Sequence, residues 1–214
     1  NGARKLPVLT PLLALLLARE GFAVLLNGMR TEEQRVLASE VLQRLEVPAW
    51  ERMQPLAAGQ VAHVATEVLH PGLARLLAVR QVLGLRTPGH SLVKLLAPCA
   101  GPAVLVGSYT HPEYSVLMRD VLVARQMTGL LSRGLEGEVV CDPRRQPRYD
   151  AVWQGQAYCV AEQQAGTLAA VPGLPQAIDA QTTADYTRAV LAGQLPVPQA
   201  VAAQVAHITA LAQR

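Results

Sequence analysis

Residues 103–141 of this 214-residue chain read AVLVGSYTHPEYSVLMRDVLVARQMTGLLSRGLEGEVVC. The short apolar run 103–107 predicts a buried strand, and 112–126 starts at a proline and has the spacing of a helix. Two further runs, 129–132 and 137–141, predict a second and a third strand. Strands that alternate with helices in this way indicate an α/β fold, with a mostly parallel central sheet flanked by helices.

The same alternation is present in the N-terminal part of the chain. Residues 10–20 predict a helix, 22–26 a buried strand and 31–46 a second helix. The tail predicts two more helices, at 183–192 and 198–213. In an open α/β sheet, ligands bind in the loops at the carboxyl ends of the strands, so we expect the functional residues there.

The composition is that of a folded protein. Half of the residues are hydrophobic and 16% are charged, which excludes a disordered acidic or basic chain. Because no linker or internal repeat interrupts the pattern, we expect a single domain over residues 1–214, with no separate second domain.

Basic residues are few but unevenly placed. The net charge is +3, too small by itself to indicate an acidic partner, and every basic residue except Lys5 and Lys94 is an arginine. The densest group is Arg144, Arg145 and Arg148, in a proline-containing loop. This loop is a candidate contact for an anionic partner, although a solvated basic loop is equally ordinary.

Targeting signals are not visible. The longest apolar run, 12–18, is far shorter than the roughly 20 residues that a membrane span needs, and no secretory signal is recognisable. Cys99, Cys141 and Cys159 are widely spaced and predict neither a disulfide framework nor a zinc site. We therefore expect a cytoplasmic protein with no membrane partner.

Four segments in order resemble the anthranilate phosphoribosyltransferases: 25–30 (LLNGMR), 79–87 (VRQVLGLRT), 107–113 (GSYTHPE) and 134–138 (GLEGE). The resemblance implies the large domain of the nucleoside phosphorylase and phosphoribosyltransferase fold. It also implies a homodimer, and it places the start of the chain after most of the N-terminal helical subdomain of those enzymes.

The phosphate-binding motifs of these enzymes are altered here. Their Gly-Thr-Gly-Gly-Asp loop, which carries the pyrophosphate of phosphoribosyl pyrophosphate on backbone amides, corresponds to NGARK, where Gly2 remains and Arg4 and Lys5 are new. Their Asn-x-Ser-Thr motif keeps one hydroxyl, Thr10, which we also expect to cap the first helix. Their Lys-His-Gly-Asn motif becomes LNGM and has lost its cation.

The remaining pocket positions follow from the same resemblance. Asn27 and Gly28 stand in the altered LNGM motif, and Arg80 and Arg86 match arginines near the anthranilate site. Surface arginines that pair with local carboxylates are an equally good interpretation of both. His90 belongs to this vestigial substrate pocket, and it has no visible acid or nucleophile partner that would make it catalytic.

The metal-binding pair of the enzymes is also changed. Their Asp-Glu pair corresponds to Glu136 and Glu138, one residue apart on the strand expected at 137–141, where both carboxylates would point to the same face. Magnesium normally neutralises the pyrophosphate leaving group, so its loss would remove most of the electrostatic catalysis. We expect no cofactor, or Mg²⁺ on Glu136 and Glu138 if the chain is a transferase.

Five segments resemble one branch of this fold more closely than the enzymes: 1–5 (NGARK), 9–13 (LTPLL), 90–95 (HSLVKL), 111–114 (HPEY) and 136–139 (EGEV). That branch is the YbiB-type DNA-binding proteins. That resemblance implies a homodimer that binds nucleic acid, preferably single-stranded DNA with little sequence preference, without catalysis. The candidate contacts are cations, namely Arg4, Lys5, Lys94, Arg144, Arg145 and Arg148. Lys94 stands where the enzymes have a proline, and aromatic residues near basic loops could stack on bases or belong to the core: Tyr109, Tyr114, Tyr149 and Trp153.

Two functions of different classes therefore compete. The leading one is non-catalytic nucleic-acid binding, which predicts binding that weakens as salt rises. The alternative is an anthranilate phosphoribosyltransferase, or a related pentosyltransferase, that uses phosphoribosyl pyrophosphate and Mg²⁺. The lost glycine loop favours the first, and we expect the chain not to be an enzyme.

Overall fold

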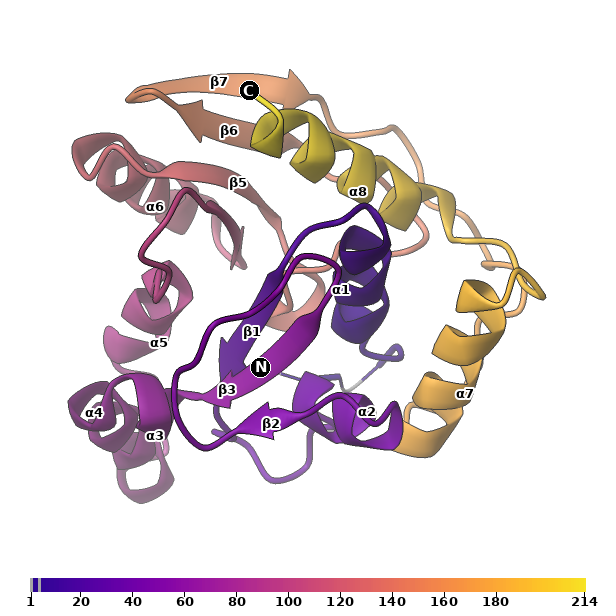
Figure 1. Ribbon diagram of the computed structural model, residues 1–214, viewed down its shortest axis with the longest axis horizontal. Helices are drawn as coiled ribbons and strands as arrows, with labels where there is room; N and C mark the ends of the chain where they lie inside the picture. Colours follow the sequence, from indigo (N-terminus) through magenta and orange to yellow (C-terminus); the bar gives the residue numbers. More distant parts are fainter. Residues whose placement is uncertain (1, 4) are drawn as a thin grey trace. The chain divides into compact units, whose positions relative to one another are not determined.

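The computed structural model describes residues 2–3 and 5–214, which form two compact units (Figure 1). The first unit comprises Asn1–Leu96 together with Pro175–Leu195. The second comprises Ala97–Leu174 together with Pro196–Arg214. Each unit has a sheet of its own, and the single domain expected over residues 1–214 stays a prediction.

The first unit is built on a parallel sheet with the strand order β1-β3-β2. β3 (Val61–Ala65) lies in the middle and pairs with β1 (Val24–Gly28) on one side and β2 (Ala49–Trp50) on the other. The helices of this unit are α1 (Thr10–Arg19), α2 (Ala38–Arg44), α3 (Thr66–Leu69), α4 (Pro71–Leu83), α5 (Gly89–Leu92), the 3-10 turn η1 (Val93–Leu95) and α7 (Ala180–Leu191).

The apolar run in α1 forms part of the core. Ala14 and Ala18 of α1 pack with Leu42 of α2 and Val61 of β3, all of them buried. α7 returns from the C-terminal part of the chain to pack against α1 and α2. Among the described residues, no helix combines the length and the apolar character needed to cross a membrane.

The second unit contains a four-stranded sheet with the order β4-β5-β6-β7. β4 and β5 are parallel, whereas β5, β6 and β7 are antiparallel. Two helices, α6 and α8, pack on this sheet. Its elements are β4 (Val104–Tyr109), α6 (Pro112–Ala124), β5 (Thr128–Arg133), the 3-10 turn η2 (Leu135–Gly137), β6 (Tyr149–Trp153), β7 (Gln156–Ala161) and α8 (Gln199–Ala212).

The α/β class is confirmed, and so is the parallel pairing of strands flanked by helices. Of the five strand pairings in the described residues, three are parallel, namely β1 with β3, β2 with β3 and β4 with β5. The two antiparallel pairings are β5 with β6 and β6 with β7, and the second of these is a hairpin. Its two turn residues, Gln154 and Gly155, both have positive φ (49° and 72°), as a two-residue turn matched to the twist of its strands requires.

The structure corrects several boundaries. The strand predicted at 137–141 is wrong: the chain forms the turn η2 there, with Glu136 in the left-handed region (φ 53°), and then an irregular segment. The helix predicted at 31–46 begins only at Ala38, and Thr10 is the first helical residue of α1, not its cap. β1 begins two residues later than expected, because the chain turns at Gly21 before it becomes extended.

A buried amide joins α8 to the irregular segment that follows η2. The Gln204 Oε1 accepts from the backbone N–H of Cys141 (2.9 Å), and its Nε2 donates to the carbonyl of Val139 (2.8 Å). The Gln204 side chain is completely buried. The segment therefore satisfies its backbone through one side chain instead of a strand partner.

Replacing this amide should destabilise the chain. Gln204→Leu has a similar shape but leaves the Cys141 N–H and the Val139 carbonyl unsatisfied in the interior. Each unsatisfied group costs about 1–3 kcal/mol, so we expect the free energy of unfolding to fall by roughly 2–4 kcal/mol. Urea unfolding of the full chain measures it. Gln181→Leu is the matched control, because Gln181 is exposed and bonds only the exposed Asp185; equal losses in the two variants would contradict the role given to Gln204.

Candidate anion-binding site

The carboxyl end of β1 is open. β1 ends at Gly28 beside Ala65, the last residue of β3, so both strands end at the same edge of the sheet. Asn27 and Gly28 are half-buried there, and a Cβ added to Gly28 would meet no atom within 4 Å. This is the edge at which an α/β sheet accepts ligands.

A carboxylate in the loop after β1 holds three arginines. The Glu32 Oε2 lies 2.6 Å from the Arg35 Nε, and its Oε1 lies 2.6 Å from an Arg80 nitrogen and 3.4 Å from an Arg86 nitrogen. Burial opposes the ionisation of Glu32, but the hydrogen bond and charge of Arg35, followed by those of Arg80, outweigh it and lower the pKa to about 2. Glu32 is therefore ionised at neutral pH.

A fourth arginine completes the group. Arg30 pairs with Glu40 of α2 (2.9 Å) and donates to the backbone carbonyls of Glu33 and Arg35 (3.1 Å each). Arg30, Arg35, Arg80 and Arg86 are called the arginine cluster below. Among the described residues, its four guanidinium groups pair with two carboxylates, Glu32 and Glu40, which leaves a surplus of two positive charges in these ion pairs.

Two buried nitrogens beside the cluster are unsatisfied. The Arg80 Nη1 and the His90 Nε2 are both buried and have no hydrogen-bond partner among the described residues. The His90 Nδ1 lies 3.1 Å from the backbone nitrogen of Thr87 and 3.2 Å from the Thr87 carbonyl oxygen, so this contact fits either tautomer of the ring. Burial lowers the pKa of His90 and outweighs the backbone hydrogen bond to Thr87, which raises it; the charges of Arg80 and Arg86 lower it further. A buried polar atom without a partner is costly, so an acceptor placed beside the Arg80 Nη1 would be bound favourably.

The loop that resembles a pyrophosphate loop is tied to the same cluster. The Gly2 carbonyl accepts from the Arg35 Nη1 (3.1 Å), and Ala3 forms an antiparallel bridge with Val36. Gly2 has φ 90°, and a Cβ there would lie 2.7 Å from the Val36 carbonyl oxygen, so only glycine fits. In this chain Gly2 therefore serves the packing of the loop on residues 35–37.

The structure brings together only part of the predicted pocket. Gly2, Arg80, Arg86 and His90 meet at the arginine cluster, next to the strand end that carries Asn27 and Gly28. The other predicted positions have different surroundings. Thr10 is buried in the first turn of α1, Lys5 is exposed, and Lys94 is half-buried in η1. Arg4 lies outside the described residues.

The basic loop of the second unit is largely neutralised. Arg144 binds Asp142 through two nitrogens (2.9 and 2.7 Å), and Arg148 binds Asp150 (2.9 Å) and Glu162 (2.8 Å). For Arg145, no ion pair is found within the described part of the chain. Three cations thus face three carboxylates, and the loop is a weaker anion site than its sequence indicated.

The candidate metal ligands do not form a ready site. Glu136 lies in η2 and Glu138 just after it. The prediction that their carboxylates share one face of a strand is therefore wrong. Within the described residues, no group of three or more His, Cys, Asp or Glu side chains that could hold a metal ion is present.

The aromatic candidates divide between core and surface. Tyr149 is completely buried and Tyr109 is 9% exposed, so both belong to the core and not to a stacking surface. Trp153 lies beneath the guanidinium of Arg214, 5.6 Å from the ring centroid. Tyr114 alone of the four is well exposed.

Sequence reasoning missed three residues of the cluster. Arg30, Glu32 and Arg35 come directly after β1, in a segment that the sequence predicts to be helical from residue 31. The two glutamates flanked by arginines at residues 30, 32, 33 and 35, placed directly after a strand, are the signal that could have identified them.

Comparisons with known proteins show what the sequence and the fold of this chain resemble. No protein family profile matches the chain. It is 33% identical over 211 residues to the uncharacterized protein YbiB of Escherichia coli (strain K12), covering 96% of this chain and 65% of that protein. The crystal structure of anthranilate phosphoribosyltransferase from Thermus thermophilus superposes with a TM-score of 0.74 and 24% identity, over 99% of this chain and 65% of that one. The chain thus spans about two thirds of each of these proteins, and the structural match establishes its fold.

Removing the central carboxylate tests the cluster. A pKa lowered from 4.5 to about 2 corresponds to roughly 3 kcal/mol, which solvent screening at this partly exposed site reduces to about 1–2 kcal/mol. Because the folded pKa is depressed, this stabilisation is complete above pH about 4.5 and is lost as the pH falls towards about 2. Glu32→Gln should therefore lower the free energy of unfolding at pH 7, and the difference from the unmodified chain should shrink over that range.

Urea unfolding at a series of pH values measures this difference. Glu33→Gln is the control, because Glu33 is an exposed neighbour in the same loop and should have a small effect at every pH. A Glu32→Gln difference that stays the same from pH 7 to about pH 2 would contradict the ion-pair origin of the effect.

Proposed function

We propose that this chain, which has the fold of the anthranilate phosphoribosyltransferases, binds the phosphates of single-stranded nucleic acid and does not turn over a substrate. One observation carries the proposal: four arginines gather at the open carboxyl end of β1 and outnumber the carboxylates paired with them by two among the described residues, where two buried nitrogens beside them also lack hydrogen-bond partners.

Guanidinium groups suit phosphate for geometric reasons. The planar fork of arginine donates two parallel hydrogen bonds to a phosphate or carboxylate, and Glu32 already holds these forks in a fixed orientation. Arg86 is the best placed to bind phosphate, since it is 45% exposed and its contact with Glu32 is the longest of the three. Contacts to phosphates carry no base information, which supports binding with little sequence preference.

We propose the absence of turnover because the groups that phosphoribosyl transfer requires are altered in this chain. Backbone amides of a glycine-rich loop normally hold a pyrophosphate, but here Gly2 offers its carbonyl to Arg35. Glu136 and Glu138 lie in and directly after the turn η2, and not side by side on a strand. Without these groups the charge of a leaving pyrophosphate is not neutralised. On the same grounds we propose that the chain needs no cofactor.

The homodimer and the cytoplasmic location belong to the same proposal. Exposed apolar side chains at the end of α4 and in the turn after it, namely Val82, Leu83 and Leu85, support association with another protein surface.

Salt dependence tests the nucleic-acid proposal. With about three to four phosphate contacts, the affinity for a labelled oligothymidylate should fall about 20- to 50-fold between about 50 and about 200 mM salt. Arg86→Ala should weaken binding and reduce the slope of log affinity against log salt by about 0.7, the value for one contact to a single strand. Fluorescence anisotropy measures both quantities.

Arg75→Ala is the matched control. Arg75 is an exposed residue of α4, five residues before Arg80 and therefore about 140° around the helix from it. This variant should bind like the unmodified chain. Binding that does not respond to salt, or a slope that Arg86→Ala leaves unchanged, would refute phosphate recognition at the cluster.

Phosphoribosyl transfer is a second candidate, which the fold and the arginine pair Arg80 and Arg86 favour. A transferase would release pyrophosphate from phosphoribosyl pyrophosphate in the presence of anthranilate and Mg²⁺. We expect no release above background for this chain. Release that disappears on removal of Mg²⁺ and in Glu138→Gln would overturn the non-catalytic proposal in favour of the enzyme.

A further inference from the structure

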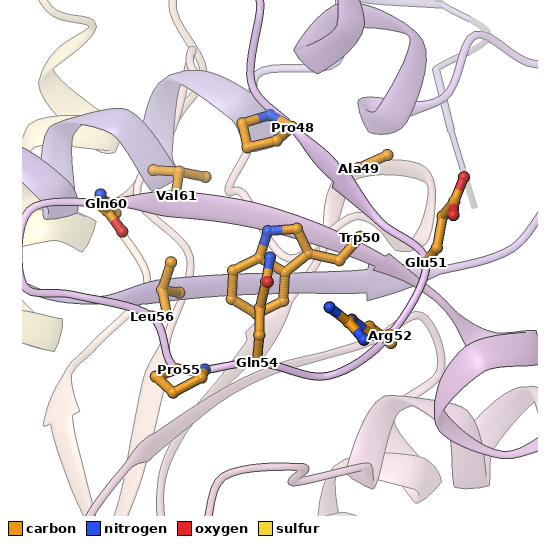
Figure 2. Close-up of a pocket in the computed structure, with 10 residues that line it drawn as sticks. All are labelled: Pro48, Ala49, Trp50, Glu51, Arg52, Gln54, Pro55, Leu56, Gln60 and Val61. Atoms are coloured by element: carbon orange, nitrogen blue, oxygen red, sulfur yellow. The ribbon is translucent and has the colours of Figure 1, made fainter.

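A hollow of the first unit, separate from the arginine cluster, lies beside the edge strand β2. It is a pocket of about 680 Å³ lined only by residues between Pro48 and Val61 (Figure 2). This volume is within the range of small-molecule sites, which is about 300–1,000 Å³. Because one continuous segment builds the pocket, its shape depends on the first unit alone.

Trp50 lies at the centre of this pocket. Figure 2 shows its indole among the lining side chains, with Pro55 and Leu56 on the loop that returns beneath it. The backbone of Trp50 is held by the parallel pairing of β2 with β3, where Trp50 is opposite Val64. The side chain is half-buried, so part of a large flat ring faces the pocket from a fixed strand position.

Polar groups in the same loop complement the ring. Arg52 lines the same pocket as the indole, while the carboxylate of its neighbour Glu51 points away in Figure 2. Arg52 is exposed, and no ion pair involving it is found in the parts of the chain that the structure describes. Gln54 also lines the pocket, and an amide can donate and accept at the edge of a base. By contrast, the Gln60 Oε1 is used within the turn, where it accepts from the Ala57 N–H (3.2 Å).

The strand register places this pocket near the arginine cluster. Val64 of β3 is opposite Trp50 of β2 and also opposite Asn27 of β1, so Trp50 and Asn27 stand in one row across the sheet. Neighbouring strands are about 4.8 Å apart, which puts the two backbones roughly 10 Å apart. A single strand of nucleic acid bound at the carboxyl end of β1 can therefore reach Trp50 within a few nucleotides.

We propose that this pocket binds one nucleotide of a single-stranded nucleic acid, with the base stacked on Trp50 and a phosphate on Arg52. The ligand class rests on the proposed function, whereas the pocket is a separate contact, on a different strand from the arginine cluster. An aromatic plate with an adjacent guanidinium is the combination that sequence-tolerant single-strand binding uses. Stacking of the base on Trp50 would add to the ionic contacts that the arginine cluster makes with phosphates.

Base stacking and phosphate contacts respond differently to the salt concentration, so fluorescence anisotropy at several salt concentrations tests the proposal. Trp50→Ala should weaken oligothymidylate binding about tenfold at every salt concentration and leave the salt slope unchanged, because no ion is released by stacking. Trp50→Phe should restore most of the affinity. Arg52→Ala should instead reduce the slope by about 0.7, as one lost phosphate contact does. Circular dichroism and thermal unfolding verify that each variant is folded.

Tryptophan fluorescence reports the contact directly, because the chain has two tryptophans, in different units. Trp153→Phe leaves Trp50 as the sole emitter, and the oligonucleotide should quench it. Trp50→Phe leaves Trp153 as the matched control, and its emission should not change. Thymidine 5′-monophosphate in the same assay distinguishes a free nucleotide from a strand; quenching by either ligand supports the pocket.

The outcomes separate this inference from the proposed function. If the chain binds the strand but Trp50 is not quenched and Trp50→Ala binds normally, the pocket proposal is overturned and phosphate binding at the cluster stands. If the chain binds no strand, the proposed function fails. In that case thymidine 5′-monophosphate tests the pocket by itself. Quenching of Trp50 fluorescence supports a nucleotide site, and unchanged Trp50 emission overturns the pocket proposal.

Discussion

The ion pairs of Glu32 hold together the part of the structure on which the candidate function depends. Its carboxylate binds Arg35 from its own loop and Arg80 and Arg86 from the end of α4 and the turn after it, which follow some 50 residues later. Without this carboxylate, three guanidinium groups would repel one another at a partly buried site. One negative charge thus allows a group of positive charges to persist at the end of β1.

The same arrangement changes the role of the first loop. In a glycine-rich phosphate loop the backbone amides face the anion, but the Gly2 carbonyl here faces Arg35, and Ala3 pairs with Val36. The Gly2 carbonyl therefore contributes to the position of Arg35. At the carboxyl end of β1 the donors gathered in this chain are side chains, and function is argued from such a site and not from the fold.

The two basic regions of the sequence differ in what surrounds them. Arg144 and Arg148 each have a carboxylate partner within their own loop or on the adjacent strands, so their charges cancel locally. Among the described residues, the arginine cluster has more cations than paired carboxylates, and two buried nitrogens beside it are unsatisfied. Density of basic residues along a sequence is therefore a poor guide to an anion site, because only the balance of charges in space determines the local potential.

The sequence alone determined the elements whose signals are local. The helices over α1, α6 and α8 and the buried strands β1, β4 and β5 follow from apolar periodicity and from proline and glycine at their ends, which act over a few residues. Tertiary structure decided the rest, since the pairing of Glu32 with Arg80, the turn at Glu136 and the position of Trp50 on an edge strand depend on distant segments. Ion pairs and burial arise from contacts between such segments, and a pattern confined to neighbouring residues contains no record of them.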